Sequence, residues 1–435
     1  MINIKGDKKI INIPNLWKLI ERFLSVMGPA YVDHCKRTAY LILKLCEEEH
    51  IIEPIKKKLV FAAYFHDIGA IGKNNEYLLN EDYDIYHSID GYLILKYQSF
   101  LKKSSKMVLY HHTSFQNKIF DKYYLPGLKI AICDRFDDWY RHNIPFNDVI
   151  NNILNYKNKN FNPIDVLAIK KILSHNDVIY DIKSGKYEDI LNEYIQSLKY
   201  STKDAESFIE MLSSLFELYN ETTFNHSKSV SVIAYMLALK MNYSADDAFK
   251  MYFAGLIHDL GKIFIPLEII EKPGKLTEDE YEIMKGHVKY LEKMADDIMP
   301  KEIFNMALYH HERCDGSGYP YKIDGDNLTI PQQILQISDV ISALLAKRSY
   351  KEEYPYEKIK EILDDNIKNN KLNKDIIEVF YKYHEEISNE ANEVILNGYI
   401  IKEKILKERE LLYKQIKDFR AKFNNLPLSN FVKNK

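Results

Sequence analysis

The sequence predicts an all-helical protein of two domains, and three observations support this prediction. Apolar residues recur at spacings of three and four along most of the chain, and no segment shows the period-two alternation of a half-buried strand. Pro54, Pro300 and Pro331 each begin such a segment, where a proline costs a helix nothing. A length of 435 residues exceeds what one simple hydrophobic core usually serves, which favours two domains.

Composition and charge exclude several classes of protein. The formal net charge of −3 provides no broad basic field, so we expect neither a nucleic-acid polymer nor a membrane surface as partner. No apolar run reaches membrane-spanning length, and the N-terminal segment is too interrupted by charge to be a signal peptide. The four cysteines form no CxxC pair, which favours a reducing compartment. We therefore expect a cytoplasmic protein.

An internal repeat organises the chain. Ten of the 14 histidines fall in two ordered sets, each of which also contains two aspartates. The first set is His34, His66-Asp67, His87, His111-His112 and Asp134, and the second is His226, His258-Asp259, His287, His310-His311 and Asp339. The first members are 192 residues apart, as are the second members, so a duplicated helical domain is the better explanation. We expect the copies within residues 1–190 and 191–385, followed by a C-terminal helical tail over 386–435.

The tail carries an apolar stripe. Ile405, Leu412 and Phe419 lie seven residues apart, with Ile401, Ile416 and Phe423 nearby. Such a stripe is typical of a dimer seam, but it also suits a helix that packs on its own domain, and the second interpretation is favoured. A homodimer through this helix or through the N-terminal domain is thus one predicted alternative.

The second set has the residue types of a centre with two metal ions. Asp259 has two carboxylate oxygens, so it can bridge two ions. We expect one ion to be completed by His226, His258 and Asp339, and the other by His287, His310 and His311. Mixed imidazole and carboxylate ligation with open positions favours two divalent ions of iron or manganese over zinc. Two ions about 3.5–4 Å apart can activate water and clamp a phosphodiester for in-line attack.

Three cationic side chains are candidates for contacts with phosphate. Lys262 lies one helical turn past His258 and is expected to neutralise a phosphate oxygen, which makes it a catalytic candidate together with Asp259. Arg348 and Lys351 are spaced to grip a second phosphate. Both could equally form a solvated helix face. A single histidine of either set would more often be structural, but six elements in the same order twice argue against that interpretation for the whole set.

These residues resemble the HD superfamily of metal-dependent phosphohydrolases, and the second half is similar to its HD-GYP branch. The similarity runs from Thr223 through HDLGKIFIP and His287 to HHERCDGSGYP, and on to Asp339 and Arg348-Ser349-Tyr350-Lys351. The resemblance implies two tandem HD-type domains and a bacterial phosphodiesterase that opens cyclic di-GMP or 3′,3′-cyclic GMP-AMP in second-messenger signalling. It also implies the ligand and substrate contacts proposed above.

Departures from the family pattern refine the expectation. Members with a third metal carry a Glu four residues before the first His, where this chain has Thr222, so we expect a binuclear site. Ser342 replaces a frequent second Asp in the Asp339 segment. The first copy has a complete ligand set, namely His34, His66, Asp67, His87, His111, His112 and Asp134, so it is a second candidate metal site.

The first copy lacks other parts of the pattern. Ala70 replaces the lysine, and HHTSFQN replaces HHERCDG. We therefore expect weak catalysis at most there, with a regulatory, dimerising or second-nucleotide role.

Two other functions compete with the phosphodiesterase. Another HD-type phosphohydrolase, acting on a nucleoside triphosphate or a stringent-response nucleotide, would not need the adjacent histidine pair. A non-catalytic cyclic-dinucleotide sensor would be marked by a lost ligand, and the second set has lost none.

Overall fold

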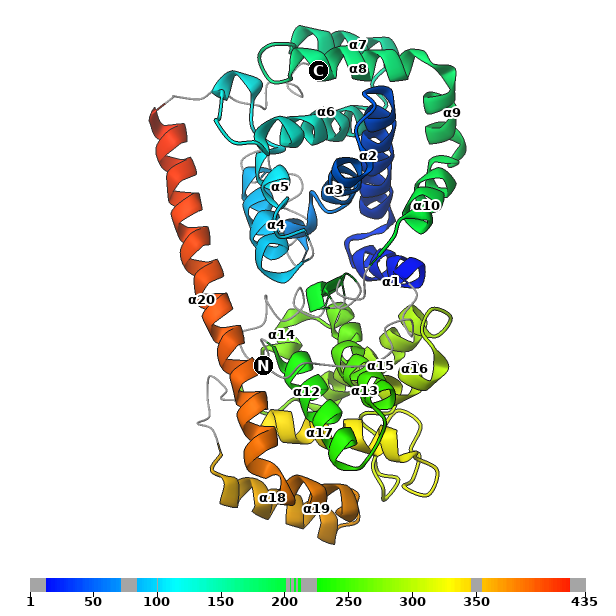
Figure 1. The fold of residues 1–435 in the computed structure, drawn as a ribbon, viewed down its shortest axis with the longest axis vertical. Coiled ribbons are helices and arrows are strands. Elements are labelled where there is room, and N and C mark those ends of the chain that lie inside the picture. The colour runs from blue at the N-terminus through cyan, green and yellow to red at the C-terminus, as the bar shows by residue number, and fades with distance from the viewer. Residues whose placement is uncertain are drawn as a thin grey trace. The chain divides into compact units, whose positions relative to one another are not determined.

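The computed structural model describes residues 13–71, 84–99, 101–200, 204, 207–208, 210–212, 225–345 and 354–422, and it is all-helical, as predicted. Within these residues, the sole strand-like pairing is an isolated bridge between Lys157 and Phe161. The chain divides into two compact units (Figure 1). The first-copy unit contains Met27–Tyr200 and Lys404–Lys435, and the second-copy unit contains Met1–Val26 and Ser201–Glu403. The linear boundaries near residues 190 and 385 stay a prediction.

The first-copy unit is built from short and medium helices that follow one another closely. They are α2 (Pro29–Glu48), α3 (Glu53–Tyr64), η3 (Ile68–Ala70), α4 (Asp84–Gln98), α5 (Lys106–Tyr110), η5 (Phe115–Asn117), α6 (Tyr124–Arg141), α7 (Phe146–Asn155), α8 (Pro163–Ser174), α9 (Asn176–Ser184) and α10 (Tyr187–Ser197).

The second-copy unit repeats this order after an N-terminal helix. Its elements are α1 (Ile13–Leu24), η2 (Ser25–Met27, whose last residue falls in the other unit), α12 (His226–Lys240), α13 (Ala245–Ile257), η6 (Leu260–Phe264), α14 (Leu267–Ile270), α15 (Glu278–Ala295), α16 (Lys301–Leu308), α17 (Ile330–Leu345), α18 (Tyr356–Lys368) and α19 (Lys374–Lys382). The long α20 (His384–Lys422) contributes to both units.

The two copies pack their equivalent helices in the same way. In the first, α2 packs on α3 and α6, and η3 packs on α4. In the second, α12 packs on α13 and α17, and η6 packs on α15. The repeat extends beyond the histidine sets, because Asn162 and Asn373 cap the equivalent helices α8 and α19 with their side-chain oxygens. The two copies therefore share their helix packing as well as the spacing of their histidines.

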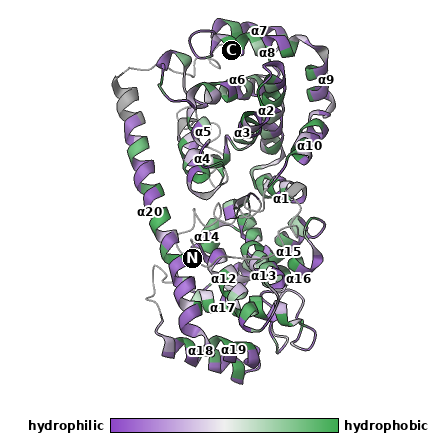
Figure 2. Cartoon of the chain, viewed as in Figure 1, coloured by the Kyte–Doolittle hydropathy of each residue, from purple (hydrophilic) through white to green (hydrophobic). Residues whose placement is uncertain are grey.

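Buried apolar faces hold each copy together. Helices α2 and α13 and the second half of α3 are largely buried, with Tyr40, Phe61 and Phe253 among the largest fully buried side chains. Figure 2 shows hydrophobic and hydrophilic bands alternating along α6 and α20, as expected for helices with one buried face. Burial of one such aromatic side chain contributes about 1.5–3 kcal/mol, so these faces fix where the site-bearing helix ends lie.

The N-terminal helix α1 packs within the second-copy unit, on α15. The side-chain amide of Asn15 donates to the carbonyl of Ile298 at 3.0 Å. Arg22 forms a two-pronged ion pair with Asp297, with N–O distances of 2.5 and 2.8 Å. We did not predict this long-range contact from the sequence.

The C-terminal part of α20 packs within the first-copy unit. Ile405 is buried, and Glu408 accepts hydrogen bonds from Lys96 at 2.6 Å on both carboxylate oxygens. The hydroxyl of Tyr413 donates to Asp90 at 3.0 Å. These contacts agree with packing on the same chain, the favoured of the two interpretations of the apolar stripe. The side chains of Ile416 and Phe419, and the whole of Phe423, lie outside the described residues.

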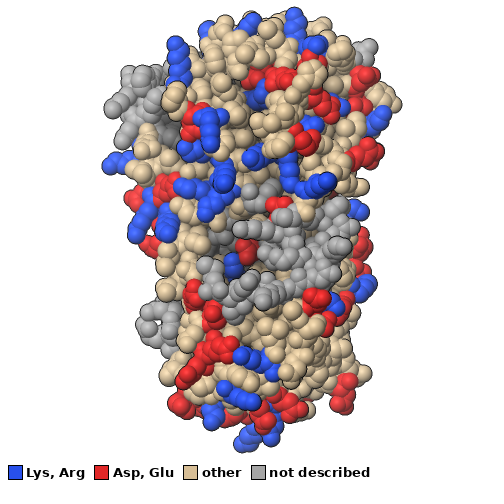
Figure 3. Space-filling model, in the orientation of Figure 1, with Lys and Arg blue, Asp and Glu red and all other residues tan. Residues whose placement is uncertain are grey.

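The surface carries charges of both signs. On the face displayed in Figure 3, Lys and Arg side chains lie among Asp and Glu side chains. Among the described helices, none combines the length and apolar character required to cross a bilayer.

Candidate metal centre

In the second copy, the two oxygens of Asp259 face two different groups of histidines. The Nε2 atoms of His226 and His258 lie 3.9 and 3.3 Å from Oδ2 of Asp259. The Nε2 atoms of His287 and His310 lie 3.6 and 3.8 Å from Oδ1. A carboxylate placed in this way can ligate one ion with each oxygen.

The remaining two members of the set lie at the same place. Oδ1 of Asp339 is 3.0 Å from Nε2 of His226, and Oδ2 is 3.9 Å from Nδ1 of His311. The candidate ligand atoms fall into two groups whose members lie within 4.8 Å of one another: His226, His258 and Asp259, and Asp259, His287, His310 and His311. The structure thus brings together all seven residues predicted around the two ions, and their role as ligands stays a prediction.

Hydrogen bonds to backbone carbonyls near the helix ends orient three of these imidazoles. Nδ1 of His258, His287 and His310 donates to the backbone carbonyl three residues earlier, at 2.7, 2.7 and 2.6 Å. This bond places the proton on Nδ1 and leaves the Nε2 lone pair directed into the site. Backbone carbonyls therefore set the tautomer that a metal ion requires.

Burial and neighbouring charges shift the pKa values of several groups in the site. Burial alone would raise the pKa of the Asp259 carboxyl, but His258 and Lys262 hold it well below its usual value. Burial lowers the pKa of His310 to about 3 and that of His287 to about 4. At neutral pH the carboxylate is ionised and these two imidazoles are neutral, which are the forms that ligate metal ions.

Two buried atoms of the site have no hydrogen-bond partner among the residues that the structure describes. They are Nε2 of His258 and Oδ1 of Asp259, and both residues are at most 5% exposed. A buried polar atom without a partner costs about 1–3 kcal/mol, so native proteins rarely leave one unsatisfied. Divalent ions on either side of Asp259 would satisfy both atoms. The donor set therefore fits the metal pair predicted from the sequence.

Lys262 lies against the carboxylate at the centre of the site. Its Nζ is 2.5 Å from Oδ2 of Asp259. The side chain reaches this position from η6, the short helix that follows the His-Asp pair. The predicted contacts of Arg348 and Lys351, and the replacement at Thr222, lie outside the described residues.

A glycine after each His-Asp pair allows η6 and η3 to pack closely. A Cβ atom at Gly261 would lie 1.9 Å from the carbonyl oxygen of His287, and one at Gly69 would lie 2.1 Å from that of His87. No side chain is compatible with these distances. Close approach of the turn to the helix that carries the third histidine is therefore a shared requirement of both copies.

Glu312, in the HHERCDG string, has a structural role that we did not predict from the sequence. It is fully buried, and its carboxylate accepts hydrogen bonds from the backbone N–H groups of Tyr321 and Ile323 at 2.7 and 2.9 Å. These bonds hold the Gly-Tyr-Pro turn against the site, where the ring of Tyr319 lies 4.6 Å from that of His311. The turn thus covers one side of the histidine pair.

The first set gathers around Asp67 in a similar way. The Nε2 atoms of His66 and His87 lie 3.3 and 3.0 Å from Oδ1 of Asp67, and that of His111 lies 3.6 Å away. Nε2 of His34 is 3.6 Å from Oδ2. Two further contacts join the rest of the set: His34 to Asp134 at 3.3 Å, and His87 to His112 at 3.0 Å. The structure therefore also brings the seven residues of this set together.

The residue behind the first histidine differs between the copies. Nδ1 of His34 contacts the Asp137 carboxylate at 2.7 Å, and Arg37 pairs with the same carboxylate at 2.5 Å. In the second copy, Nδ1 of His226 contacts the hydroxyl of Ser342 at 3.1 Å. We did not single out Asp137, although it aligns with Ser342 when Asp134 is aligned with Asp339.

The HD domain family matches both halves of the chain, at residues 31–139 and 210–375. The two matches together span more than half of the chain and contain both histidine sets. The chain belongs to the HD domain family.

Relatives with named activities match one or both halves. Over 408 residues the chain is 24% identical to the 3′3′-cGAMP-specific phosphodiesterase 1 of Vibrio cholerae, a match that covers 88% of this chain and 93% of that protein. It is 32% identical over 231 residues to a cyclic di-GMP phosphodiesterase of Thermotoga maritima, which covers 48% of this chain and 62% of that protein. The solved structure of a cyclic GMP-AMP-specific phosphodiesterase from V. cholerae is also similar. The match covers 84% of this chain and 97% of that chain, with 18% identity and a TM-score of 0.49.

Proposed function

We propose that the chain hydrolyses a phosphodiester bond of a bacterial cyclic dinucleotide, cyclic di-GMP or 3′,3′-cyclic GMP-AMP, at the second histidine set. The observation that carries this proposal is the division of the histidines between the two oxygens of Asp259. A site for one ion would not need a carboxylate with imidazoles on both of its oxygens. The names of the relatives that match one or both halves of the chain support the substrate class.

Each candidate ion has its own protein ligands. His226, His258 and Asp339 would hold one, His287, His310 and His311 would hold the other, and Asp259 would bridge them. We propose iron or manganese, because both accept mixed nitrogen and oxygen ligation and leave positions open for substrate. Bound ions would supply Lewis-acid stabilisation of phosphate charge and lower the pKa of water.

The residues of the chain contribute charge and shape around the metal ligands. The Lys262 ammonium group, beside Asp259, would donate to a phosphate oxygen and stabilise the charge that develops on it. The ring of Tyr319 covers His311 and limits the access of water from that side. Glu312 maintains this cover through its two backbone hydrogen bonds. The first set has alanine in place of the lysine, and we propose a regulatory or ligand-binding role there.

Product analysis tests the proposal. Protein purified without oxygen and loaded with Fe²⁺ or Mn²⁺ is incubated with cyclic di-GMP, 3′,3′-cyclic GMP-AMP, a nucleoside triphosphate and a stringent-response nucleotide, and the products are separated by chromatography. We expect a linear dinucleotide from at least one cyclic substrate, and none from the Asp259→Ala variant. Hydrolysis of the triphosphate or stringent-response nucleotide alone would overturn the proposal. Tight binding of a cyclic dinucleotide without turnover would assign a sensor instead.

A further inference from the structure

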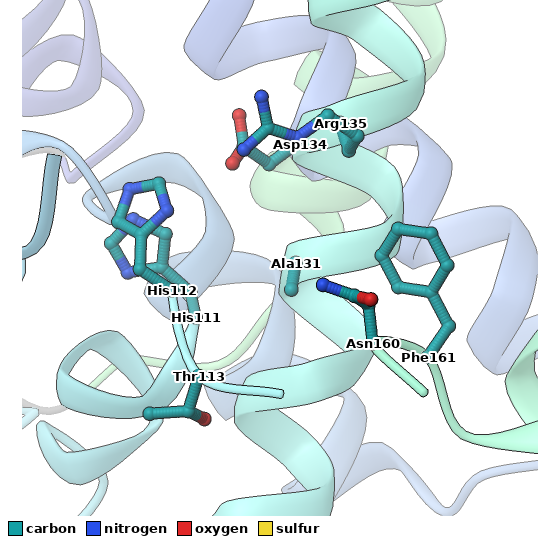
Figure 4. Close-up of a pocket in the computed structure, with 8 residues that line it drawn as sticks. All are labelled: His111, His112, Thr113, Ala131, Asp134, Arg135, Asn160 and Phe161. Carbon is teal, nitrogen blue, oxygen red and sulfur yellow. The ribbon is translucent and has the colours of Figure 1, made fainter. Parts of the chain in front are cut away.

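A pocket adjoins the first histidine set. Its volume is about 30 Å³, it is open to solvent, and it lies between His112 and Asp134 on one side and Asn160 and Phe161 on the other (Figure 4). His111, Thr113, Ala131 and Arg135 complete the wall. The pocket therefore opens directly onto candidate metal ligands of the first copy.

Two small residues create this space. When the copies are aligned on their histidine pairs and on Asp134 and Asp339, Thr113 corresponds to Glu312 and Ala131 corresponds to Gln336. In the second copy both larger side chains are buried, and the Gln336 amide donates to the backbone carbonyl of Glu312. Loss of both side chains from the first copy leaves a cavity at the equivalent place.

A third replacement gives the pocket a positive charge. Arg135 corresponds to Val340 of the second copy and follows the candidate ligand Asp134 directly in α6. Its ion pair with Asp138 is long, at 3.5 Å, and its side chain is 24% exposed. The guanidinium group thus keeps donors available at the pocket wall, whereas valine could offer none.

The opposite wall offers an amide and an aromatic ring. The Asn160 amide lies 3.4 Å from the Ser114 hydroxyl, near the limit for a hydrogen bond, and its backbone carbonyl accepts from Phe115 at 3.0 Å. The backbone bond fixes the position of this wall. Phe161 supplies an apolar surface beside the amide. Guanidinium, amide and aromatic groups around one cavity match a phosphate attached to a planar base.

We propose that this pocket binds the phosphate of a nucleotide, through Arg135 and Asn160, next to the metal ligands of the first set. The residues that differ from the second copy, Thr113, Ala131 and Arg135, form this binding site. It is separate from the hydrolytic site proposed for the second copy. The nucleotide could be a mononucleotide or one phosphate of a cyclic dinucleotide, because both present the same group to Arg135.

Calorimetric titration of the full chain tests this proposal. The Asp259→Ala protein, loaded with Mn²⁺, is titrated with GMP, AMP, cyclic di-GMP, 3′,3′-cyclic GMP-AMP and inorganic phosphate. We expect saturable binding of at least one nucleotide, more tightly than phosphate. Arg135→Val, which installs the second copy's residue, should weaken it at least about tenfold, as expected for loss of a charge-assisted hydrogen bond. Lys171→Ala removes an exposed charge outside the pocket and should leave it unchanged.

A second variant tests the cavity itself. Ala131→Gln refills the pocket with the second copy's side chain and should also weaken binding at least about tenfold. If the Ala131→Gln variant loses its helical circular dichroism, the proposal is tested by the Arg135→Val variant alone, because Arg135 is partly exposed and its replacement should not disturb folding. Nucleotide affinity unaffected by Arg135→Val would overturn the proposal, as would equal affinity for inorganic phosphate and nucleotides. Hydrolysis by proteins that retain Asp259 is measured separately, so failure here is distinguishable from failure of the proposed phosphodiesterase.

Discussion

Seven residues of the first histidine set match seven of the second, but the groups that surround them differ. Both copies place an aspartate among imidazoles, and both rely on a glycine to pack the turn after it. The second copy adds a lysine beside the aspartate and a turn anchored by Glu312. The first copy adds an aspartate and an arginine behind His34, together with an open pocket.

This difference separates what the fold supplies from what individual side chains supply. The shared helices bring the ligand atoms together, and backbone carbonyls orient several of the imidazoles in each copy, as for His66 and His258. Charge stabilisation and access to the site depend on residues outside the ligand set. A complete ligand set therefore predicts metal binding in both copies. Lys262 and the anchored turn favour catalysis in the second copy, with weak catalysis at most in the first.

The largest effect should come from removal of the central aspartate of the second copy. Asp259→Ala deletes the predicted bridge, so turnover of the cyclic dinucleotide should fall by more than the roughly 100-fold that loss of an outer-shell partner can cause. Metal content, measured by elemental analysis, should fall with it. The matched variant Asp67→Ala should retain most of the activity. Comparable losses from the two substitutions would contradict the assigned roles.

A smaller loss should follow removal of the lysine that the first copy lacks. Lys262→Ala should lower kcat by about 10²–10³, the usual range for deletion of one group that stabilises transition-state charge. Metal content should stay at the level of the unmodified protein, because the amine is not a ligand. Lys250→Ala, a change at a partly exposed lysine outside the site, is the control. Loss of metal from the Lys262 variant would show that the lysine instead supports the ligand geometry.

Removal of the Glu312 side chain should destabilise the protein more than removal of the equivalent side chain, Thr113, in the first copy. Glu312→Ala leaves the N–H groups of Tyr321 and Ile323 without their acceptor, so the free energy of unfolding should fall by about 1–3 kcal/mol. The matched change Thr113→Ala should cost less, because the Thr113 hydroxyl makes one bond, to the Tyr110 carbonyl. Urea denaturation measures both variants. An equal cost at the two positions would remove the argument for an anchored turn.

The smallest effect concerns the residues behind the first histidine. Changing Arg37 and Asp137 together to serine mimics the second copy, where Ser229 and Ser342 stand. The metal affinity of the first site should fall by about tenfold, the lower end of the range for outer-shell partners, because a serine still contacts the histidine in the second copy. Competition with a chelator measures this affinity in the Asp259→Ala background. An unchanged affinity would mean that Asp137 has no influence on the ligand.

The ligand sets could be predicted from the sequence because histidine and aspartate are rare enough for their order and spacing to reveal the duplication. The all-helical fold followed from the spacing of apolar residues. The role of Asp137 was accessible in principle, since the alignment of Asp134 with Asp339 places it opposite Ser342. We did not draw that inference, because a carboxylate behind a ligand leaves no spacing signal of its own.

Other features depend on side-chain volume and long-range packing, which no local pattern encodes. The pocket arises from the small size of Thr113 and Ala131, and its meaning emerges only beside the buried Gln336. The pairing of Arg22 with Asp297 joins residues far apart along the chain, where neither side chain marks its partner. Glu312 belongs to a recognisable string, but its hydrogen bonds depend on the path of the turn.

The most direct test of the account is anomalous diffraction from crystals of the full chain grown with Mn²⁺. Data collected on either side of the manganese absorption edge would locate each ion. We predict two peaks about 3.5–4 Å apart, one near each carboxylate oxygen of Asp259, with His258 ligating the first ion and His287 the second. A single peak at this position, or two peaks that do not share Asp259, would contradict the account.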